Sequence, residues 1–416
     1  MKNQSVCISG VGSILPSGIG WRELWSASKN ATHALTYLRQ PLLSGGDRII
    51  FGAVQSQMSA EAILPRKSIK YFSQPSIWAS LAAKQAVAEA GWDLEAGSGG
   101  KLGVFACQND RTVPCLEDLL PTFPSKGEGE FAEMFVERAL VQRRLNPFVC
   151  MKSLSSNALS AVCLALGHNG FGTILGQGEG MGYAAFRQAQ SAIRSGRLDA
   201  AIVICTSSVN GLYALASLRR AGLLDPAAGR HGFQPYGPDG AGVVFGEGAV
   251  ALFLESSTSA ARRGRIGVAE ILGTAFEYGD GRLGRFRSGS YHRCLGKLGQ
   301  PGPIEAVDLV VGEGRGLDDA AERAEIASIQ PGASWLTSTS WVTGVIPAAS
   351  ELLQVAVGAL AIRTATIPGA PYKIEPSAGP KWAEGTTSMG SCRSVLATTW
   401  ASKGFSAMTL LGQQRH

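Results

Sequence analysis

One glycine-rich stretch places a single carboxylate where proteins often do chemistry. Residues 172–186 read GTILGQGEGMGYAAF, which predicts a strand, a tight turn and the start of a helix, with Glu179 at the leading edge of that helix. A helix N-terminus favours negative charge, because it presents free N–H groups and the positive end of the helix dipole. Such a turn can cradle a phosphate, expose a nucleophile or hold a structural anion.

The spacing of the glycines disfavours nucleotide binding. A dinucleotide loop needs G-x-G-x-x-G, but counting from Gly176 puts Met181 at the third glycine position. Counting from Gly178 puts Tyr183 there, and no Walker-type Lys-Ser/Thr pair follows the turn. A nucleophile suits the geometry better, since a strand-to-helix turn lifts one side chain off the backbone. A glutamate is a poor acyl acceptor, however, because a mixed anhydride would hydrolyse.

The rest of the chain predicts a layered α/β fold that positions this turn. Near-continuous apolar runs predict strands buried on both faces, over residues 6–12, 101–107, 200–206, 249–255, 307–312, 335–340 and 405–412. Apolar periodicity predicts helices over 77–91, 183–196 and 349–362. Alternation of strands and helices favours an α/β fold, in two halves of 1–258 and 259–416 that each hold a glycine turn between strand and helix.

Composition argues against several functional classes. The 416 residues are 45% hydrophobic and 17% charged, which suits a globular protein. No window of about 18 uncharged apolar residues predicts a membrane span, and the start MKNQSVCISGVG lacks the apolar stretch of a signal peptide. The eight cysteines are scattered without a C-x-x-C pair, which favours buried thiols over disulfides or zinc ligands. We therefore expect a cytoplasmic protein without a metal or a cofactor.

The positive net charge of +6 is not gathered into a nucleic-acid-binding stripe, so nucleic acid is not an expected partner. The densest basic segment is RLGRFRSGSYHRCLGK, residues 282–297. Two interpretations of this segment stay open. It is either a solvated loop or a docking patch for an acidic partner, since surface charge steers association more than it dictates fold.

From end to end the chain resembles the β-ketoacyl synthase family of condensing enzymes, which have the thiolase fold. The resemblance rests on VCISGVGSILPSGIG (6–20), KSIKYFSQPSIWASLAAKQAVAEAG (67–91), NGFGTILGQGEGMGYAAFRQAQSAIRSGRLDAAIVICTS (169–207) and FQPYGPDGAGVVFGEGAVALFLE (233–255). It implies a five-layer αβαβα arrangement with internal duplication, in which the turn around Glu179 matches the segment that carries the family's nucleophile.

The same resemblance implies that the reactive side chains have been lost. Family enzymes use a cysteine that accepts the acyl chain, and two histidines and a lysine that support decarboxylation and stabilise the enolate and oxyanion. Matched by motif, these positions hold Glu179 for the cysteine, Glu313 for the first histidine, Ser340 for the lysine and Val345 for the second histidine. The family's Gly-Phe-Gly-Gly loop becomes WASKG, residues 400–404, and none of the five histidines falls at a required position. Because such residues act as a unit, we expect no condensing activity from this chain alone.

This profile is similar to the chain length factor subunit of type II polyketide synthases. The resemblance implies a heterodimer with an active ketosynthase subunit, contact with an acyl carrier protein through that complex, and a tunnel at the interface that limits polyketide length. Those subunits often carry Gln at the turn, so Glu179 is a departure. Position within RTVPCLEDLLPTF (111–123) makes Val113, Leu116 and Leu119 candidates for the tunnel lining, with core packing as the alternative.

Other interpretations stay open beside this one. Glu179 is either a hydrogen-bonded carboxylate that closes the turn or a helper in decarboxylation, which would make the chain a malonyl-carrier decarboxylase. A purely structural partner without influence on the tunnel is the remaining alternative. We expect Glu313 and Arg315 to form a local surface pair, a kind of contact that contributes little stability. Asp319 and Glu322 are expected to serve as first-turn acids of a helix.

Overall fold

The computed structural model describes residues 4–39, 48–56, 58–94, 101–123, 130–224, 233–237, 242–279, 284–298, 306–375, 379–401 and 404–414. Its main sheet has the strand order β14-β12-β11-β16-β17-β10-β1-β9-β7-β5-β6, with β2 (Gly18–Ile19) beside β1. Within this path, the strands on one side of the β1–β10 junction come from the first part of the sequence and those on the other side from the last part.

The first set is β1 (Val6–Leu15), β5 (Leu102–Asp110), β6 (Phe171–Ile174), β7 (Ala200–Ser208) and β9 (Gly248–Ser256). Strand β5 runs parallel to β6 and β7, whereas β9 runs antiparallel to β1 and β7. Every residue of β1, β7 and β9 is buried, as the apolar runs predict for strands covered on both faces.

The second set is β10 (Ala269–Glu277), β11 (Leu309–Val311), β12 (Trp335–Thr337), β14 (Lys381–Trp382), β16 (Ser394–Ala401) and β17 (Phe405–Gly412). The two sets meet where β1 pairs with β10 over only two residue pairs, Cys7 with Glu270 and Ile8 with Ala269. A junction this short lets the two parts of the sheet turn away from each other and enclose helices. The boundary between residues 258 and 259 stays a prediction.

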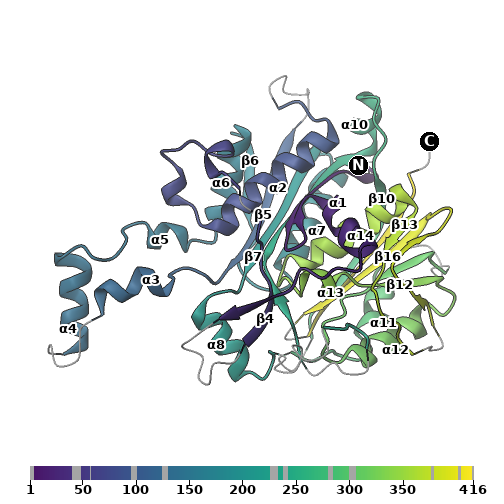
Figure 1. Cartoon of the computed structure of the whole chain (residues 1–416). Helices are drawn as coiled ribbons and strands as arrows, with labels where there is room; N and C mark the ends of the chain where they lie inside the picture. Colours follow the sequence, from purple (N-terminus) through teal and green to yellow (C-terminus); the bar gives the residue numbers. More distant parts are fainter. Residues whose placement is uncertain are drawn as a thin grey trace.

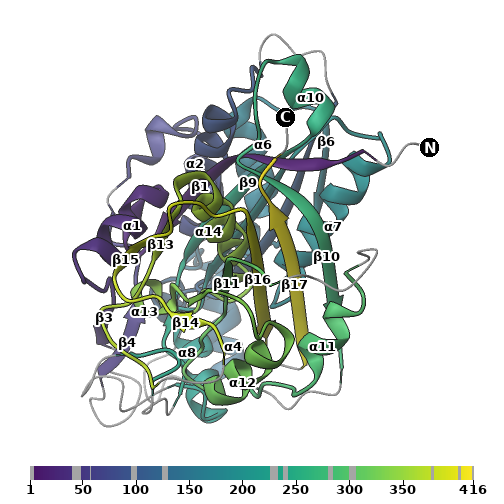
Figure 2. The same ribbon diagram turned by 90° about the vertical axis from the view of Figure 1, so that its right-hand side faces the viewer.

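Helices complete five layers. Helices α7 (Met181–Arg194) and α14 (Ser350–Thr364) contact each other between the two parts of the sheet. Helices α2 (Gln74–Ala90) and α6 (Asn157–Leu166) cover the outer face of the first part, and α11 (Ser290–Leu295) packs on β10 and β17 with α12 (Asp319–Ile329) beside it. Figures 1 and 2 show this arrangement from two sides, and it confirms the αβαβα fold that the resemblance implied.

The remaining elements are short. The helices are α1 (Trp21–Lys29), α8 (Leu212–Arg220), α10 (Ser257–Arg262) and α13 (Ser340–Thr343). One small sheet contains β3 (Thr36–Arg39), β4 (Arg48–Gly52) and β8 (Phe245–Gly246). A second one pairs β13 (Thr366–Pro368) with β15 (Thr386–Ser388). In the part of the chain that the structure describes, no helix is long and apolar enough to cross a bilayer.

An arm formed by residues 111–123 and 130–154 leaves the end of β5 and projects from the layered body, as Figure 1 shows at the left. It contains α3 (Leu116–Leu119), α4 (Phe131–Val136), the π-helical turn Glu137–Val141 and α5 (Val149–Lys152). Val113 and Leu119 lie here half-buried, and their assignment to a tunnel lining stays a prediction. The side chain of Leu116 lies outside the described residues.

Close packing of α2 on β1 depends on glycine. A β-carbon added to Gly12 would lie 1.9 Å from the carbonyl oxygen of Ala82, so the two backbones touch. We expect Gly12→Ala to lower the free energy of unfolding by roughly 2–3 kcal/mol, because neither backbone can move away cheaply. The control Gly296→Ala meets nothing closer than 3.7 Å and should change it by less than about 0.5 kcal/mol. Urea denaturation of both variants measures this, and equal stabilities would contradict the packing argument.

Candidate functional site

The turn that precedes α7 is built from glycines, and we call residues 176–180 the elbow turn. Gly176, Gly178 and Gly180 have φ angles of 76°, 112° and 88°, a region that other residues rarely adopt. Gly180 is the N-cap of α7, so Glu179 stands directly before the helix. The buried face of α7, including Tyr183 and Phe186, holds the helix against the sheet.

The carboxylate of Glu179 is paired with a guanidinium from the other part of the chain. Arg315 lies in the loop between β11 and α12, and its Nη2 is 2.5 Å from Oε1 of Glu179. The Arg315 side chain is 4% exposed and that of Glu179 is 16% exposed. A charge with so little contact with water needs a partner, because desolvation without one costs several kcal/mol. Sequence reasoning did not predict this partner, a cation from a distant loop.

Arg315 is itself held by the chain segment that replaces the family's Gly-Phe-Gly-Gly loop. Its Nη1 donates a hydrogen bond of 2.8 Å to the carbonyl oxygen of Trp400, at the end of β16. Its guanidinium carbon lies 5.1 Å from the centre of the indole ring, in reach of a cation–π contact. Trp400 is buried. The ion pair therefore sits between the elbow turn and β16, and residues 402–403 of this loop lie outside the described part.

The turn over residues 313–316 is buried, so the expected surface pair of Glu313 and Arg315 is wrong. Glu322 accepts hydrogen bonds from the amides of Glu313 and Gly314, at 3.0 and 3.1 Å. Asp319 accepts one from the amide of Gly316 at 2.9 Å. Both acids lie in the first turn of α12, as the sequence predicted. They face inward, because these buried turn amides need acceptors.

Ser340 joins the same cluster. Its hydroxyl donates to the carbonyl of Gly314 at 2.5 Å, and the hydroxyl of Thr399 donates to the carboxyl of Glu313 at 2.6 Å. The structure thus brings Glu179, the 313–316 turn and Ser340 together. All are held by contacts within the protein.

Val345 has an apolar side chain and so adds no polar contact to this cluster. It is buried in an apolar cluster with Phe51 and Phe245, and its amide donates to the carbonyl of Val244. Of the histidines in the described residues, His33 and His292 are exposed and His168 lies beside β6. None of these three has a hydrogen bond or ion pair with the Glu179 cluster.

Sequence reasoning missed Glu351, which occupies the amides at the start of α7. The backbone N–H groups of Gly180 and Tyr183 both donate to its carboxyl group. Burial raises the pKa of Glu351 to about 8, although these two hydrogen bonds lower it. The signal was present, because Glu351 is an acidic residue in the otherwise apolar run ASELLQVAVGALAI, and a buried carboxyl group must find donors.

Neither Cys205 nor Glu179, both at the elbow turn, is an activated nucleophile. The thiol of Cys205 lies under the start of α7, where a β-carbon on Gly182 would be 3.2 Å from its sulfur. Burial raises the pKa of Cys205 well above its ordinary value, so it is not a thiolate at neutral pH. Glu179 is engaged with Arg315. This geometry closes the elbow turn without offering an acyl acceptor.

The ion pair yields a test by double-mutant cycle. Arg315→Met should lower the free energy of unfolding by about 3 kcal/mol, because it leaves the Glu179 carboxylate buried without its cation. Glu179→Leu combined with Arg315→Met should cost at least about 1 kcal/mol less than the sum of the single changes. Chemical denaturation measures all variants, and additive losses would show that the pair is not coupled.

Glu313 yields a pH dependence. Burial raises its pKa to about 7, and the nearby Arg315 offsets this only in part. In the unfolded chain a glutamate titrates near pH ~4.3, so between that pH and about 7 the folded state holds the extra proton. Stability should therefore fall as pH rises through this window, by up to about 1.4 kcal/mol per pH unit for this group. Glu313→Gln should flatten that part of the curve in denaturation at pH 5, 6 and 7, and the exposed Glu384→Gln should not. An unchanged slope in Glu313→Gln would contradict the assignment.

Comparison with known proteins relates the chain to ketoacyl synthases. It is 24% identical over 378 residues to the tetracenomycin polyketide synthase ketoacyl synthase beta subunit of Streptomyces glaucescens, covering 87% of each chain. It is 25% identical over 281 residues to the alpha subunit of the same synthase, covering 65% of this chain and 62% of the relative.

Solved structures agree on the fold. The ishigamide ketosynthase/chain length factor has a TM-score of 0.80 at 19% identity, and a beta-ketoacyl synthase from Burkholderia phymatum has 0.82 at 18%, each matching 99% of this chain and 100% of its own. A type II polyketide synthase acyl-carrier protein in complex with its ketosynthase, bound to the hexaketide, has 0.76 at 18% with the same coverage. The sequence model of the family described as "Beta-ketoacyl synthase, N-terminal domain" matches residues 3–260. The chain therefore belongs to the β-ketoacyl synthase family.

Proposed function

We propose that this chain is a non-catalytic ketosynthase-like subunit of the chain length factor type. It pairs with an active ketosynthase and helps to set polyketide length through a tunnel between the two subunits. The observation that carries this proposal is the Glu179–Arg315 ion pair, at the turn that by motif resembles the family's nucleophile segment. The similarity to a ketoacyl synthase beta subunit over 87% of both chains supports it.

Exposed apolar side chains on the arm support a protein partner. Leu140 is 69% exposed and Val141 68%, and Phe131, Met151 and Leu154 are also largely exposed. Apolar side chains gathered on one projecting segment mark an interaction surface. A partner that covers the arm would remove this surface from water, as large obligate interfaces of about 2,000–5,000 Å² do.

The edge of the main sheet supports the same conclusion. Strand β6 pairs only with β5 among the described strands, which leaves its other edge without a neighbouring strand. Phe171 at its start is 54% exposed. An open edge with an exposed aromatic residue favours pairing with another chain. This edge lies near the arm, because β6 pairs with β5 and the arm follows β5 in the chain.

The tunnel assignment rests on position. Val113 and Leu119 follow β5 at the base of the arm, half-buried and therefore available to a cavity that a partner would close. A larger side chain in a closed tunnel would stop a growing chain earlier, because packed interiors accept little extra volume. The acyl carrier protein that delivers the chain would meet the pair, as in the similar complex of a carrier protein with its ketosynthase.

Two other functions make different predictions. A decarboxylase would need Glu179 free to move a proton, and the guanidinium of Arg315 disfavours that. It would release carbon dioxide from a malonyl carrier as a purified chain and lose this activity in Glu179→Ala. A purely structural partner would copurify with a ketosynthase but leave product length unchanged when the tunnel candidates are enlarged.

Co-expression with an active ketosynthase subunit tests the proposal. The unaltered pair should copurify one to one, and Leu140→Asp with Val141→Asp should reduce recovery of the complex at least about tenfold, because charge on the arm opposes burial. Ile266→Asp, at a 60% exposed site outside the arm, is the matched control and should copurify normally. Val113→Phe in the intact pair should shorten the polyketide detected by mass spectrometry. Failure of the unaltered chains to copurify would overturn the proposal.

A further inference from the structure

A cleft of about 560 Å³ opens where α2 and α6 end and where β5 and β6 begin. The arm and the elbow turn follow the opposite ends of these two strands, so the cleft is separate from both. We call it the β5–β6 cleft. Its volume lies within the range of about 300–1,000 Å³ that small-molecule sites usually have.

The inner wall of the β5–β6 cleft is apolar and held in place. Trp92, Leu166 and Leu198 line it and are 6%, 8% and 9% exposed. The ring of Trp92 has its centre 5.3 Å from that of Phe253, and the guanidinium carbon of Arg263 lies 5.0 Å from the same ring. An apolar wall that is already ordered binds a ligand without a further loss of side-chain entropy.

A second aromatic residue lines the cleft and remains exposed. Phe171 is 54% exposed, and its ring centre lies 5.5 Å from that of Phe105. A β-carbon on Gly103 would lie 3.2 Å from the Phe171 ring, so this ring rests over the backbone of β5. Aromatic rings pack favourably against other planar rings, and Phe171 and Trp92 together favour a planar aromatic ligand.

Two of the polar residues that line the cleft are basic, Lys101 and His168. Nε2 of His168 lies 3.2 Å from the carbonyl oxygen of Phe171 and must donate to it, because a carbonyl oxygen only accepts. The carboxylate of Asp199 accepts a hydrogen bond of 2.8 Å from the backbone amide of Lys101 and lies 3.5 Å from Arg262. The side chain of Lys101 is exposed and forms no ion pair within the described residues.

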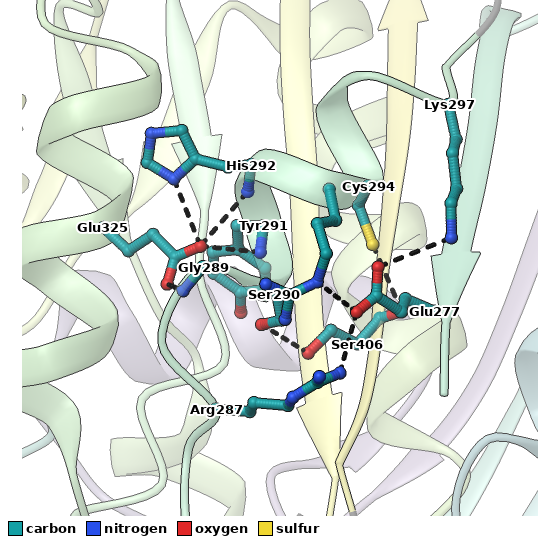
Figure 3. A network of polar contacts seen from close by, with 11 residues as sticks. Glu277, Arg287, Gly289, Ser290, Tyr291, His292, Cys294, Lys297, Glu325 and Ser406 are labelled. Carbon is teal, nitrogen blue, oxygen red and sulfur yellow. Dashed lines mark hydrogen bonds and ion pairs between the residues drawn. The ribbon is translucent and has the colours of Figure 1, made fainter. Parts of the chain in front are cut away.

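The basic segment around α11 differs in this respect. Three of its cations converge on the carboxyl group of Glu277, as Figure 3 shows, so each has an acidic partner within the chain; they are Arg287, Arg293 and Lys297. Arg282, at the start of that segment, lies outside the described residues. Small-molecule sites commonly combine apolar walls with a few charged groups that orient the ligand, and Lys101 suits that role for an anion.

We propose that the β5–β6 cleft binds a planar aromatic carboxylate. The rings of the ligand pack against Trp92 and Phe171, and its carboxylate pairs with the ammonium group of Lys101. This site goes beyond the proposed function and does not depend on it. Phe171 also begins the strand whose free edge the proposed function assigns to a partner, so a bound ligand would lie beside that edge.

The test titrates 2-naphthoate onto the purified chain and measures binding by calorimetry at low salt. One molecule should bind per chain, with a dissociation constant below about 1 mM. Lys101→Gln should weaken this binding about threefold, which is typical of the loss of one exposed ion pair, and high salt should reduce the difference. Phe171→Ala should weaken it about fivefold through the lost ring contact.

The uncharged analogue 2-naphthamide separates the charge from the rings. It should bind the unaltered chain about threefold more weakly than 2-naphthoate, lose affinity in Phe171→Ala, and be insensitive to Lys101→Gln. Lys67→Gln is the matched control and should bind both compounds normally, because this exposed lysine precedes α2 while the cleft lies at the other end of that helix.

Absence of saturable 2-naphthoate binding would overturn the inference. Equal affinity in the unaltered chain, Lys101→Gln and Phe171→Ala would also overturn it, because the compound would then bind elsewhere. An equal loss for both compounds in Lys101→Gln would overturn the pairing of the carboxylate with Lys101. Circular dichroism of each variant checks that it folds. These titrations need no partner subunit, so their failure would leave the proposed function untouched.

Discussion

A buried charge must have a counter-charge, and the centre of this protein is organised around that constraint. Glu179 stands before α7 and Arg315 after β11, so their contact ties together the two parts of the main sheet. The stacking of Arg315 on Trp400 brings in a third segment. Each member depends on the others, because removing one leaves the rest desolvated and unpaired. An ion pair built into the fold in this way is a structural element of the protein.

The same logic applies to the hydrogen-bond donors around the pair. The amides at the start of α7, which could receive a substrate's negative charge, are taken by Glu351. Those of the 313–316 turn are taken by Glu322 and Asp319. Burial raises the pKa of Glu351 to about 8 and that of Asp319 to about 8, so both favour the protonated form at neutral pH. These donors are thus satisfied from within the chain.

The exposed surface of the chain has features that suit binding to another protein. The arm exposes apolar side chains such as Leu140, and β6 leaves a sheet edge open, which together suit a partner subunit.

The sequence by itself determined the α/β class, the buried strands and the position of Glu179 before α7, because apolar periodicity and glycine turns are local signals. Motif by motif, it also located Ser340 and the 313–316 turn, which the structure brings beside Glu179. Only the tertiary structure decided that Arg315 turns inward, since a Glu-x-Arg turn looks the same in sequence on a surface or in a core. The carboxyl group of Glu351 lies 171 residues from Gly180 in the chain, and only folding puts these groups in contact. Pairing between distant charged groups follows from how the layers pack, which no short stretch of sequence encodes.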